Sequence, residues 1–245
     1  MEILRNAYTE ILKKIDIEAF TLSEDRYSGV FLPIPFAEYW RSPVKIVLVG
    51  RETAGWNTLN GKNRLARAAG LIPGVTTEQA VAEAIARYEK YLPVKKDGTL
   101  TLTSRSRFMQ YYFRLARALN ISPRAIVYAN LLAWDYHGRT PLLRPSKERQ
   151  EVISVSLSLL AAQIMHLQPD VIIFASGARK TDFIIKRLFT GHLNGYTTAE
   201  VIPGKLWEFN AGETVCFRIA HPRVMRGHQE QRDEVIKRIR QRYSR

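Results

Sequence analysis

Apolar residues along the chain follow two patterns, short continuous runs and longer stretches at helical spacing. The continuous runs are bounded by turn-forming residues and predict buried strands over residues 44–49, 125–132, 171–175 and 215–220. Apolar residues spaced three and four apart predict helices over residues 1–20, 104–119, 146–167, 178–189 and 230–243. Thr76 with Gln79 predicts a capping box that opens another helix, and residues 206–209 a short edge strand.

Strands that alternate with helices are typical of a parallel sheet with helices on both faces. The sequence therefore predicts an α/β fold, a three-layer α/β/α sandwich with a central, mainly parallel four-stranded sheet. A length of 245 residues fits one domain over residues 1–245. We expect the helix and loop of residues 1–40 to pack on the core of that domain.

The chain is strongly basic, and this charge indicates an anionic partner. It has 37 Lys and Arg against 23 Asp and Glu, a net charge of +14. Nucleic acid is the favoured partner, because each cation that contacts a phosphate of a polyphosphate releases counterions and so strengthens binding. An anionic membrane surface is the alternative, but we find no apolar stretch near the roughly 20 residues that cross a bilayer. Much of the excess lies in residues 101–150 and 221–245.

Cysteine and histidine usage limits the possible cofactors. Cys216 is the only cysteine and lies inside an apolar run, which predicts a buried thiol and excludes an iron–sulfur cluster held by four cysteines of one chain. No histidine pair has metal spacing, so we expect no metal and no cofactor. The first residues lack the order of a secretory signal, from which we expect a cytoplasmic protein.

Two acid–base side chains follow predicted strands at opposite ends of the chain. Glu52 comes just after the strand that ends near Gly50, and His221 directly after residues 215–220. Ligands of open α/β sheets bind at the carboxyl ends of the strands. A carboxylate that orients water, together with an imidazole, is typical of a hydrolytic site.

Two further positions at strand ends carry polar groups. Asn130 lies in an apolar run, where an amide is either a satisfied structural group or a reader of a base edge, because it both donates and accepts. Ser176 and Gly177 follow residues 171–175, where a hydroxyl and backbone N–H groups suit a phosphate. The same pair is also common as an ordinary helix cap.

In this order, the motifs resemble those of the uracil-DNA glycosylase superfamily. The family's first motif is Gly-Gln-Asp-Pro-Tyr, and residues 50–54 read Gly-Arg-Glu-Thr-Ala. Its last motif is His-Pro-Ser-Pro-Leu, and residues 221–225 read His-Pro-Arg-Val-Met. Between them the family has an asparagine on the second core strand, matched by Asn130, and a small loop after the third, matched by residues 175–177. The resemblance covers residues 40–240.

The resemblance implies a DNA glycosylase that flips a nucleotide into a pocket and leaves an abasic site. Glu52 would position the water and stabilise the cationic sugar, and His221 would hydrogen-bond the departing base. The implied substrate-binding residues, with two aromatic candidates for stacking on the base, are Gly50, Arg51, Ala54, Trp56, Phe108 and Asn130. The implied DNA contacts, among which Met225 would be a wedge, are Ser104, Arg105, Arg107, Ser176, Gly177, Arg223, Met225 and Arg226. The resemblance also implies a monomer.

Ala54 departs most clearly from the family pattern. The family has a tyrosine here that closes the pocket beside the 5-position of a pyrimidine. Glu52 is one methylene longer than the family's aspartate, and Arg51 adds a charge beside it. We therefore predict that a pyrimidine with a bulky 5-substituent, as in hypermodified phage DNA, is preferred over uracil. Such a preference would fit a role in phage defence.

Two other classes of function stay open from the sequence alone. A non-catalytic DNA-binding protein would use the same fold for recognition without base release. A nucleotide-binding α/β enzyme would bind a free nucleotide, but the chain lacks the Gly-x-x-x-x-Gly-Lys-Ser/Thr phosphate loop.

Overall fold

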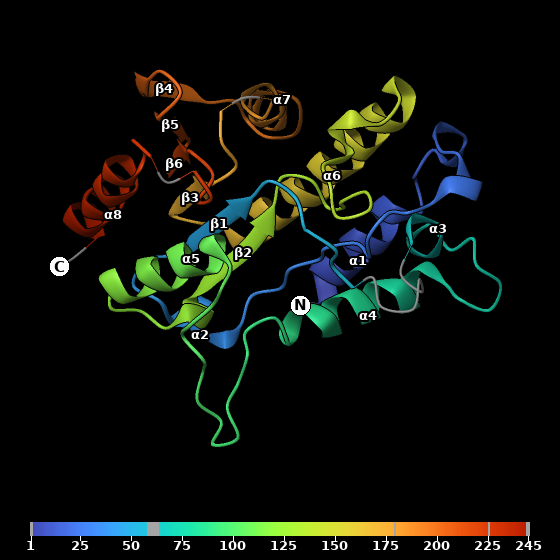
Figure 1. The fold of residues 1–245 in the computed structure, drawn as a ribbon, viewed down its shortest axis with the longest axis horizontal. Helices are drawn as coiled ribbons and strands as arrows, with labels where there is room; N and C mark the ends of the chain where they lie inside the picture. Colours follow the sequence, from blue (N-terminus) through green and yellow to red (C-terminus); the bar gives the residue numbers. More distant parts are fainter. Residues whose placement is uncertain (1, 58–63, 179, 225, 244–245) are drawn as a thin grey trace. The chain divides into compact units, whose positions relative to one another are not determined.

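The computed structural model describes residues 2–57, 64–178, 180–224 and 226–243, which divide into two compact units (Figure 1). The first unit comprises Met1–Ile34, Glu52–Leu92 and Asn130–His166. The second comprises Pro35–Arg51, Pro93–Ala129 and Leu167–Arg245. This division into compact units does not test the expectation of a single domain over residues 1–245, which stays a prediction.

The first unit is helical. Its helices are α1 (Glu2–Leu12), α3 (Leu65–Ala68), α4 (Thr77–Glu89) and α6 (Ser146–Leu167, whose last residue is counted with the second unit). Short 3-10 turns lie at Ile17–Ala19, Leu22–Glu24 and Pro141–Leu143. Helix α1 packs along α4 (Figure 1). The predicted capping box is confirmed, because Thr76 and Gln79 exchange both of its hydrogen bonds.

Helix α6 is the longest helix of the first unit and the most apolar. By length and composition it is sufficient to cross a membrane, contrary to the expectation that no stretch comes near this limit. However, 67% of its most apolar window is buried inside the protein. A mostly buried helix of this kind is typical of a protein core, because a bilayer-spanning segment would expose its apolar surface to lipid.

The sheet belongs to the second unit, except for the last residue of β2, and has six strands in the order β2-β1-β3-β6-β5-β4. Their bounds are β1 Ile46–Gly50, β2 Ile126–Asn130, β3 Val171–Phe174, β4 Thr197–Ile202, β5 Leu206–Ala211 and β6 Thr214–Ile219. Strands β1, β3 and β6 are parallel neighbours, whereas β5 is antiparallel to β6 and β4 to β5. The carboxyl ends of β1, β3 and β6 therefore lie at one edge.

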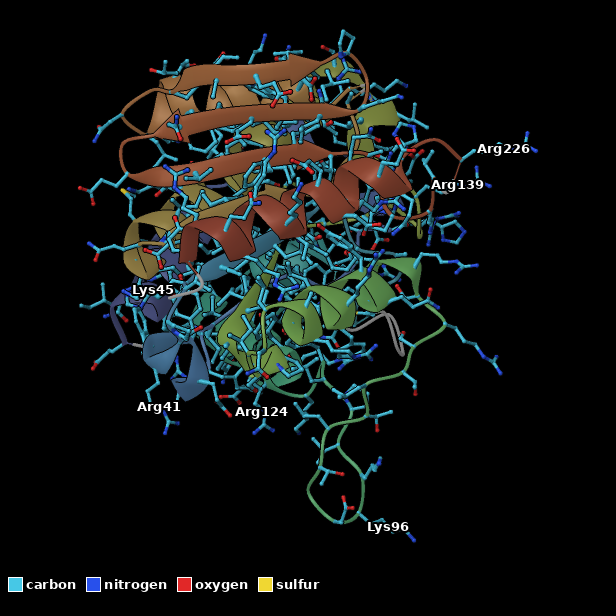
Figure 2. All side chains as sticks on the ribbon, turned by 90° about the vertical axis from the view of Figure 1, so that its left-hand side faces the viewer. Arg41, Lys45, Lys96, Arg124, Arg139 and Arg226 are labelled. Carbon is cyan, nitrogen blue, oxygen red and sulfur yellow. The ribbon has the colours of Figure 1, made fainter. Side chains whose placement is uncertain are left out.

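Helices cover both faces of this sheet. The second unit contains α2 (Ala37–Arg41), α5 (Arg107–Ala118), α7 (Asp182–His192) and α8 (Gln229–Tyr243), with a 3-10 turn at Pro123–Ala125. Side chains alternate along a strand, so Glu208 of β5 faces α8, where it meets Arg238, while its neighbour Phe209 faces α7 and packs on Phe189. Helices α8 and α5 thus lie on one face and α7 on the other (Figures 1 and 2).

The observed sheet confirms the α/β class and corrects its details. It has six strands and a partly antiparallel half instead of four mainly parallel strands. Strand β4 was not predicted, because its side chains are mostly exposed and lack the apolar alternation of a half-buried strand. Residues 206–209 are part of β5, an inner strand rather than an edge strand, because β4 pairs with it. Helix α7 begins at Asp182, four residues later than expected.

Candidate functional site

The loop after β1 carries Glu52 and lies in the first unit. Glu52 is half-buried, Thr53 is buried and Ala54 is exposed. Gly50 is the last residue of β1 and has strand conformation, so it does not supply the tight turn that the sequence suggested. The turn is made by Gly55, whose φ of 81° is the left-handed conformation that favours glycine.

A buried carboxylate holds this loop in place. Asp135 has no exposed surface, and its Oδ2 accepts hydrogen bonds from Thr53 Oγ1 (2.5 Å), Gly55 N (2.8 Å) and Trp56 N (3.4 Å). Its Oδ1 accepts from Gly138 N (2.8 Å). Four donors around one buried carboxylate offset the cost of its burial. Asp135 therefore fixes the backbone that follows Glu52.

Ser28 supports Asp135 from a second segment of the first unit. Asp135 N donates to Ser28 Oγ (3.0 Å), and Ser28 N donates to the carbonyl oxygen of Asp135 (2.9 Å). Sequence reasoning did not assign a role to either residue. The available signal was a carboxylate placed directly after the apolar residues 131–134, where an acid needs several donors to be buried.

Asn130 is the predicted site residue with the most unusual environment. Asn130 is the last residue of β2 and is only 5% exposed. Neither the Oδ1 nor the Nδ2 atom has a hydrogen-bond partner among the described residues. Burial of an unpaired amide costs a few kcal/mol. The described residues therefore supply no partner for Asn130, as a satisfied structural amide, the simpler of the two sequence interpretations, would require.

Trp56 is engaged by the protein itself. Its ring meets Phe31 edge-on, with 4.7 Å between centroids, and the guanidinium of Arg87 lies 4.6 Å from its centroid. Phe108, the other aromatic candidate, belongs to the second unit, is 8% exposed and packs against Tyr128. A stacking role for either ring stays a prediction.

In the second unit, three loops meet at the carboxyl edge of β1, β3 and β6. They contain Arg51, the Ser176–Gly177 pair and His221. Gly177 N donates to the carbonyl oxygen of Ile219 (3.1 Å), and a Cβ atom at Gly177 would lie 3.8 Å from His221 N. Ser176 is 2% exposed. The Gly177 N–H is thus used to join two loops, and a phosphate contact at this pair stays a prediction.

The imidazole of His221 is held as a neutral hydrogen-bond donor. Its Nδ1 accepts from the backbone N–H of Arg223 (3.1 Å), so the proton of the neutral ring is on Nε2. Burial, followed by the charges of Arg51, Arg223 and Arg232, lowers the pKa of His221 to about 4. At neutral pH this ring therefore carries no charge and has an N–H group at Nε2.

A buried arginine fixes the His221 loop. Arg232 of α8 is 3% exposed, and its Nη2 donates to the carbonyl oxygens of His221 (3.1 Å) and Val224. Sequence reasoning treated this residue only as part of a basic helix. Its apolar neighbours on the buried face of α8, Val235 and Ile236, were the signal that residue 232 points inward.

The predicted DNA contacts of the second unit are mostly exposed. Arg105, Arg107, Arg223 and Arg226 are exposed, and Ser104 is half-buried. The backbone carbonyl of Ser104 accepts from Gln110 Nε2 (2.8 Å), which ties it to the first turn of α5. The predicted wedge, Met225, lies outside the described residues. Their roles as DNA contacts stay predictions.

Positive charge reaches several sides of the second unit. Figure 2 labels Arg226 after β6, and Arg41, Lys45 and Arg124 toward the other end of the unit. Lys45 Nζ lies 5.8 Å from the Trp40 ring centroid, and Arg124 lies 5.4 Å from that of Phe36. The charge is therefore not confined to the carboxyl edge of the sheet.

Potential metal and thiol chemistry is limited in the described part of the chain. No group of three or more His, Cys, Asp or Glu side chains there is arranged to hold a metal ion. Cys216 is fully buried, as predicted, and burial raises the pKa of its thiol well above the ordinary value. A reactive thiolate at this position is therefore disfavoured.

Comparison of the chain with known proteins assigns no family. No protein-family model matches it, and no curated protein matches it either.

Proposed function

We propose that this protein is a DNA glycosylase that hydrolyses the N-glycosidic bond of a flipped, modified pyrimidine and leaves an abasic site. Asn130 is the observation that carries the proposal. An amide that is nearly fully buried, at a strand end and without a hydrogen-bond partner in the described residues, is costly unless a ligand satisfies it. The pairing edge of a pyrimidine offers adjacent donor and acceptor atoms, which match the two halves of the amide.

The protonation state of His221 supports the same reaction. When the N-glycosidic bond breaks, the bonding electrons move to the base and negative charge develops on its oxygen. A neutral Nε2–H donor stabilises that oxygen in the transition state. Because the pKa of His221 is about 4, the ring holds this form throughout the neutral range.

Glu52 supplies the second half of the proposed chemistry. A carboxylate favours the positive charge that develops on the sugar, and it orients a water molecule toward the anomeric carbon. The fixed backbone at Thr53, Gly55 and Trp56 limits where the preceding carboxylate lies. Such preorganisation is what an electrostatic role requires.

Ala54 supports a modified base as the substrate. It lies exposed between Thr53 and Gly55, both of which are held by Asp135. Its methyl group is small, whereas the family resemblance places a tyrosine at this position. In the proposal, the space that a tyrosine would fill accepts a bulky 5-substituent.

Replacement of Glu52 by Gln tests whether the protein is an enzyme. The amide has nearly the same shape as the carboxylate but no charge, so base release should fall by about 10²- to 10⁴-fold. The affinity for the same duplex should change little, because the DNA contacts stay. Release of free base from a duplex with a bulky 5-substituted cytosine is measured by mass spectrometry, and binding by fluorescence anisotropy.

Glu213→Gln is the matched control, because Glu213 is exposed in the turn between β5 and β6. It should release base at the wild-type rate. Full activity of Glu52→Gln would remove the proposed role of the carboxylate. Tight DNA binding by the wild type without base release from any modified duplex would favour a non-catalytic DNA-binding protein.

A further inference from the structure

A groove with a volume of about 500 Å³ lies in the second unit, along α5 and α8. Its lining includes the apolar side chains of Ala118 and Ile236, with the cations Arg114, Lys237 and Arg240 and the carboxylate of Asp233 around them. The volume is within the range of ordinary ligand sites. Both helices lie side by side on one face of the sheet (Figure 2).

The charges of the groove leave a positive excess. Arg114 pairs with Asp233 across the two helices, which neutralises one cation. Lys237 Nζ lies 3.9 Å from Glu234 Oε2 on the surface of α8, with 65% of its side chain exposed, so this pair is weak. Arg240 is exposed and has no ion pair among the described residues. Lys237 and Arg240, three residues apart, therefore lie on one side of α8 and are available to an anion.

We propose that this groove binds a single-stranded stretch of nucleic acid, with its phosphates at Lys237 and Arg240. The proposal rests on the proposed function only in taking nucleic acid as the partner. The apolar floor of Ala118 and Ile236 suits sugars and base faces, while the cations suit the backbone. A net charge of +14 favours a polyanion over a single small anion, because each contact adds counterion release.

The apolar floor of the groove favours a single strand over a duplex. In a duplex the base faces are stacked inside and only base edges are exposed in the grooves, whereas a single strand exposes sugars and base faces that can lie on Ala118 and Ile236.

The position of the groove also connects it with the candidate site. Helix α8 follows the His221 loop, and α5 follows the segment with Arg105. A strand that leaves the carboxyl edge of the sheet thus meets positive charge along its path.

The test is the salt dependence of binding to unmodified DNA. The double variant Lys237→Ala with Arg240→Ala removes the two proposed phosphate contacts. The slope of log K against log salt concentration for a single-stranded 20-mer should fall in magnitude by about 1.4, because each lost contact contributes about 0.7. Affinity for a duplex of the same sequence should change less than twofold. Fluorescence anisotropy between 50 and 300 mM NaCl, about the range in which such contacts are screened, gives both quantities.

Lys95→Ala with Lys96→Ala is the control of equal charge, because both residues are exposed in another loop of the second unit. An unchanged slope in the groove variant, with unaltered thermal unfolding, would overturn the proposal. An equal fall of the salt slope in the control variant would also overturn the proposal, because it would show that any two surface cations attract the DNA equally. This test does not depend on base release. If the wild type releases base but the groove variant keeps the wild-type salt slope, only the proposed groove is contradicted. If the wild type releases no base but the groove variant has the smaller slope, only the proposed function is contradicted.

Discussion

At the scale of single residues, two buried charges fix the loops on which the proposed chemistry depends. In the first unit, Asp135 accepts from the backbone after Glu52. In the second unit, Arg232 donates to the backbone of the His221 loop. One is an acceptor for N–H groups and the other a donor to carbonyl groups, so each satisfies loop backbone that would otherwise lack partners. Both act on position rather than on a substrate.

Arg232 also contributes to the electrostatic environment of His221. Burial and the charges of Arg51 and Arg223 lower the pKa of the imidazole more than Arg232 does, so Arg232→Gln should raise that pKa from about 4 by only a small part of the difference from its ordinary value of about 6.5. The Cε1–H resonance of His221 in a pH titration by NMR measures it. Arg240→Gln on the same helix should leave the pKa unchanged. A pKa that stays at about 4 in Arg232→Gln would show that burial and the charges of Arg51 and Arg223 account for the shift without Arg232.

The lowered pKa also has a consequence for stability. The unfolded chain binds a proton at His221 below about pH 6.5, whereas the folded chain binds it only below about pH 4. Between these values the unfolded state holds more protons, so this residue lowers the free energy of unfolding as the pH falls from about 6.5 to about 4. The contribution is absent above about pH 6.5, where both states are neutral at this position.

At the scale of elements, the loop that follows β1 depends on Asp135 for its shape. Asp135→Asn replaces one acceptor oxygen by a donor, so at least one of the four donors loses its partner. We expect a loss of about 1–3 kcal/mol in the free energy of unfolding and faster amide exchange at Gly55 and Trp56. Urea denaturation and hydrogen exchange measure these effects. Asp97→Asn, in an exposed turn, is the control and should change stability by less than about 0.5 kcal/mol. Unchanged protection at Gly55 would contradict the role of Asp135.

Apolar periodicity was sufficient to predict most elements. Residues 146–167 form α6 with the predicted bounds, and residues 215–220 differ from β6 by one residue at each end. Strand β4 was not predicted because it is held in the sheet by hydrogen bonds to β5, and its mostly exposed residues show no apolar pattern. Asp135 escaped for a related reason. The donors that make its burial possible come from residues 53–56, about 80 positions earlier in the chain, and such pairing is invisible to local patterns.

At the scale of the whole molecule, the proposal of a nucleic-acid partner depends on charge. From a net charge of +14 we expect a sequence-independent attraction to polyphosphate that falls with salt. The α/β sheet of the second unit provides a carboxyl edge with Arg51 and His221, which is where ligands of open sheets bind. The proposed selection of a modified base depends on a much smaller feature, the methyl group of Ala54.

The most direct test of the proposed function compares base release from two duplexes that differ at one nucleotide, uracil in one and a bulky 5-substituted cytosine in the other. Mass spectrometry detects the free base, and alkaline cleavage detects the abasic site. We predict release from the duplex with the 5-substituted cytosine at a rate at least tenfold above that from the uracil duplex. Release from the uracil duplex alone, or from neither duplex at any enzyme concentration, would contradict the account.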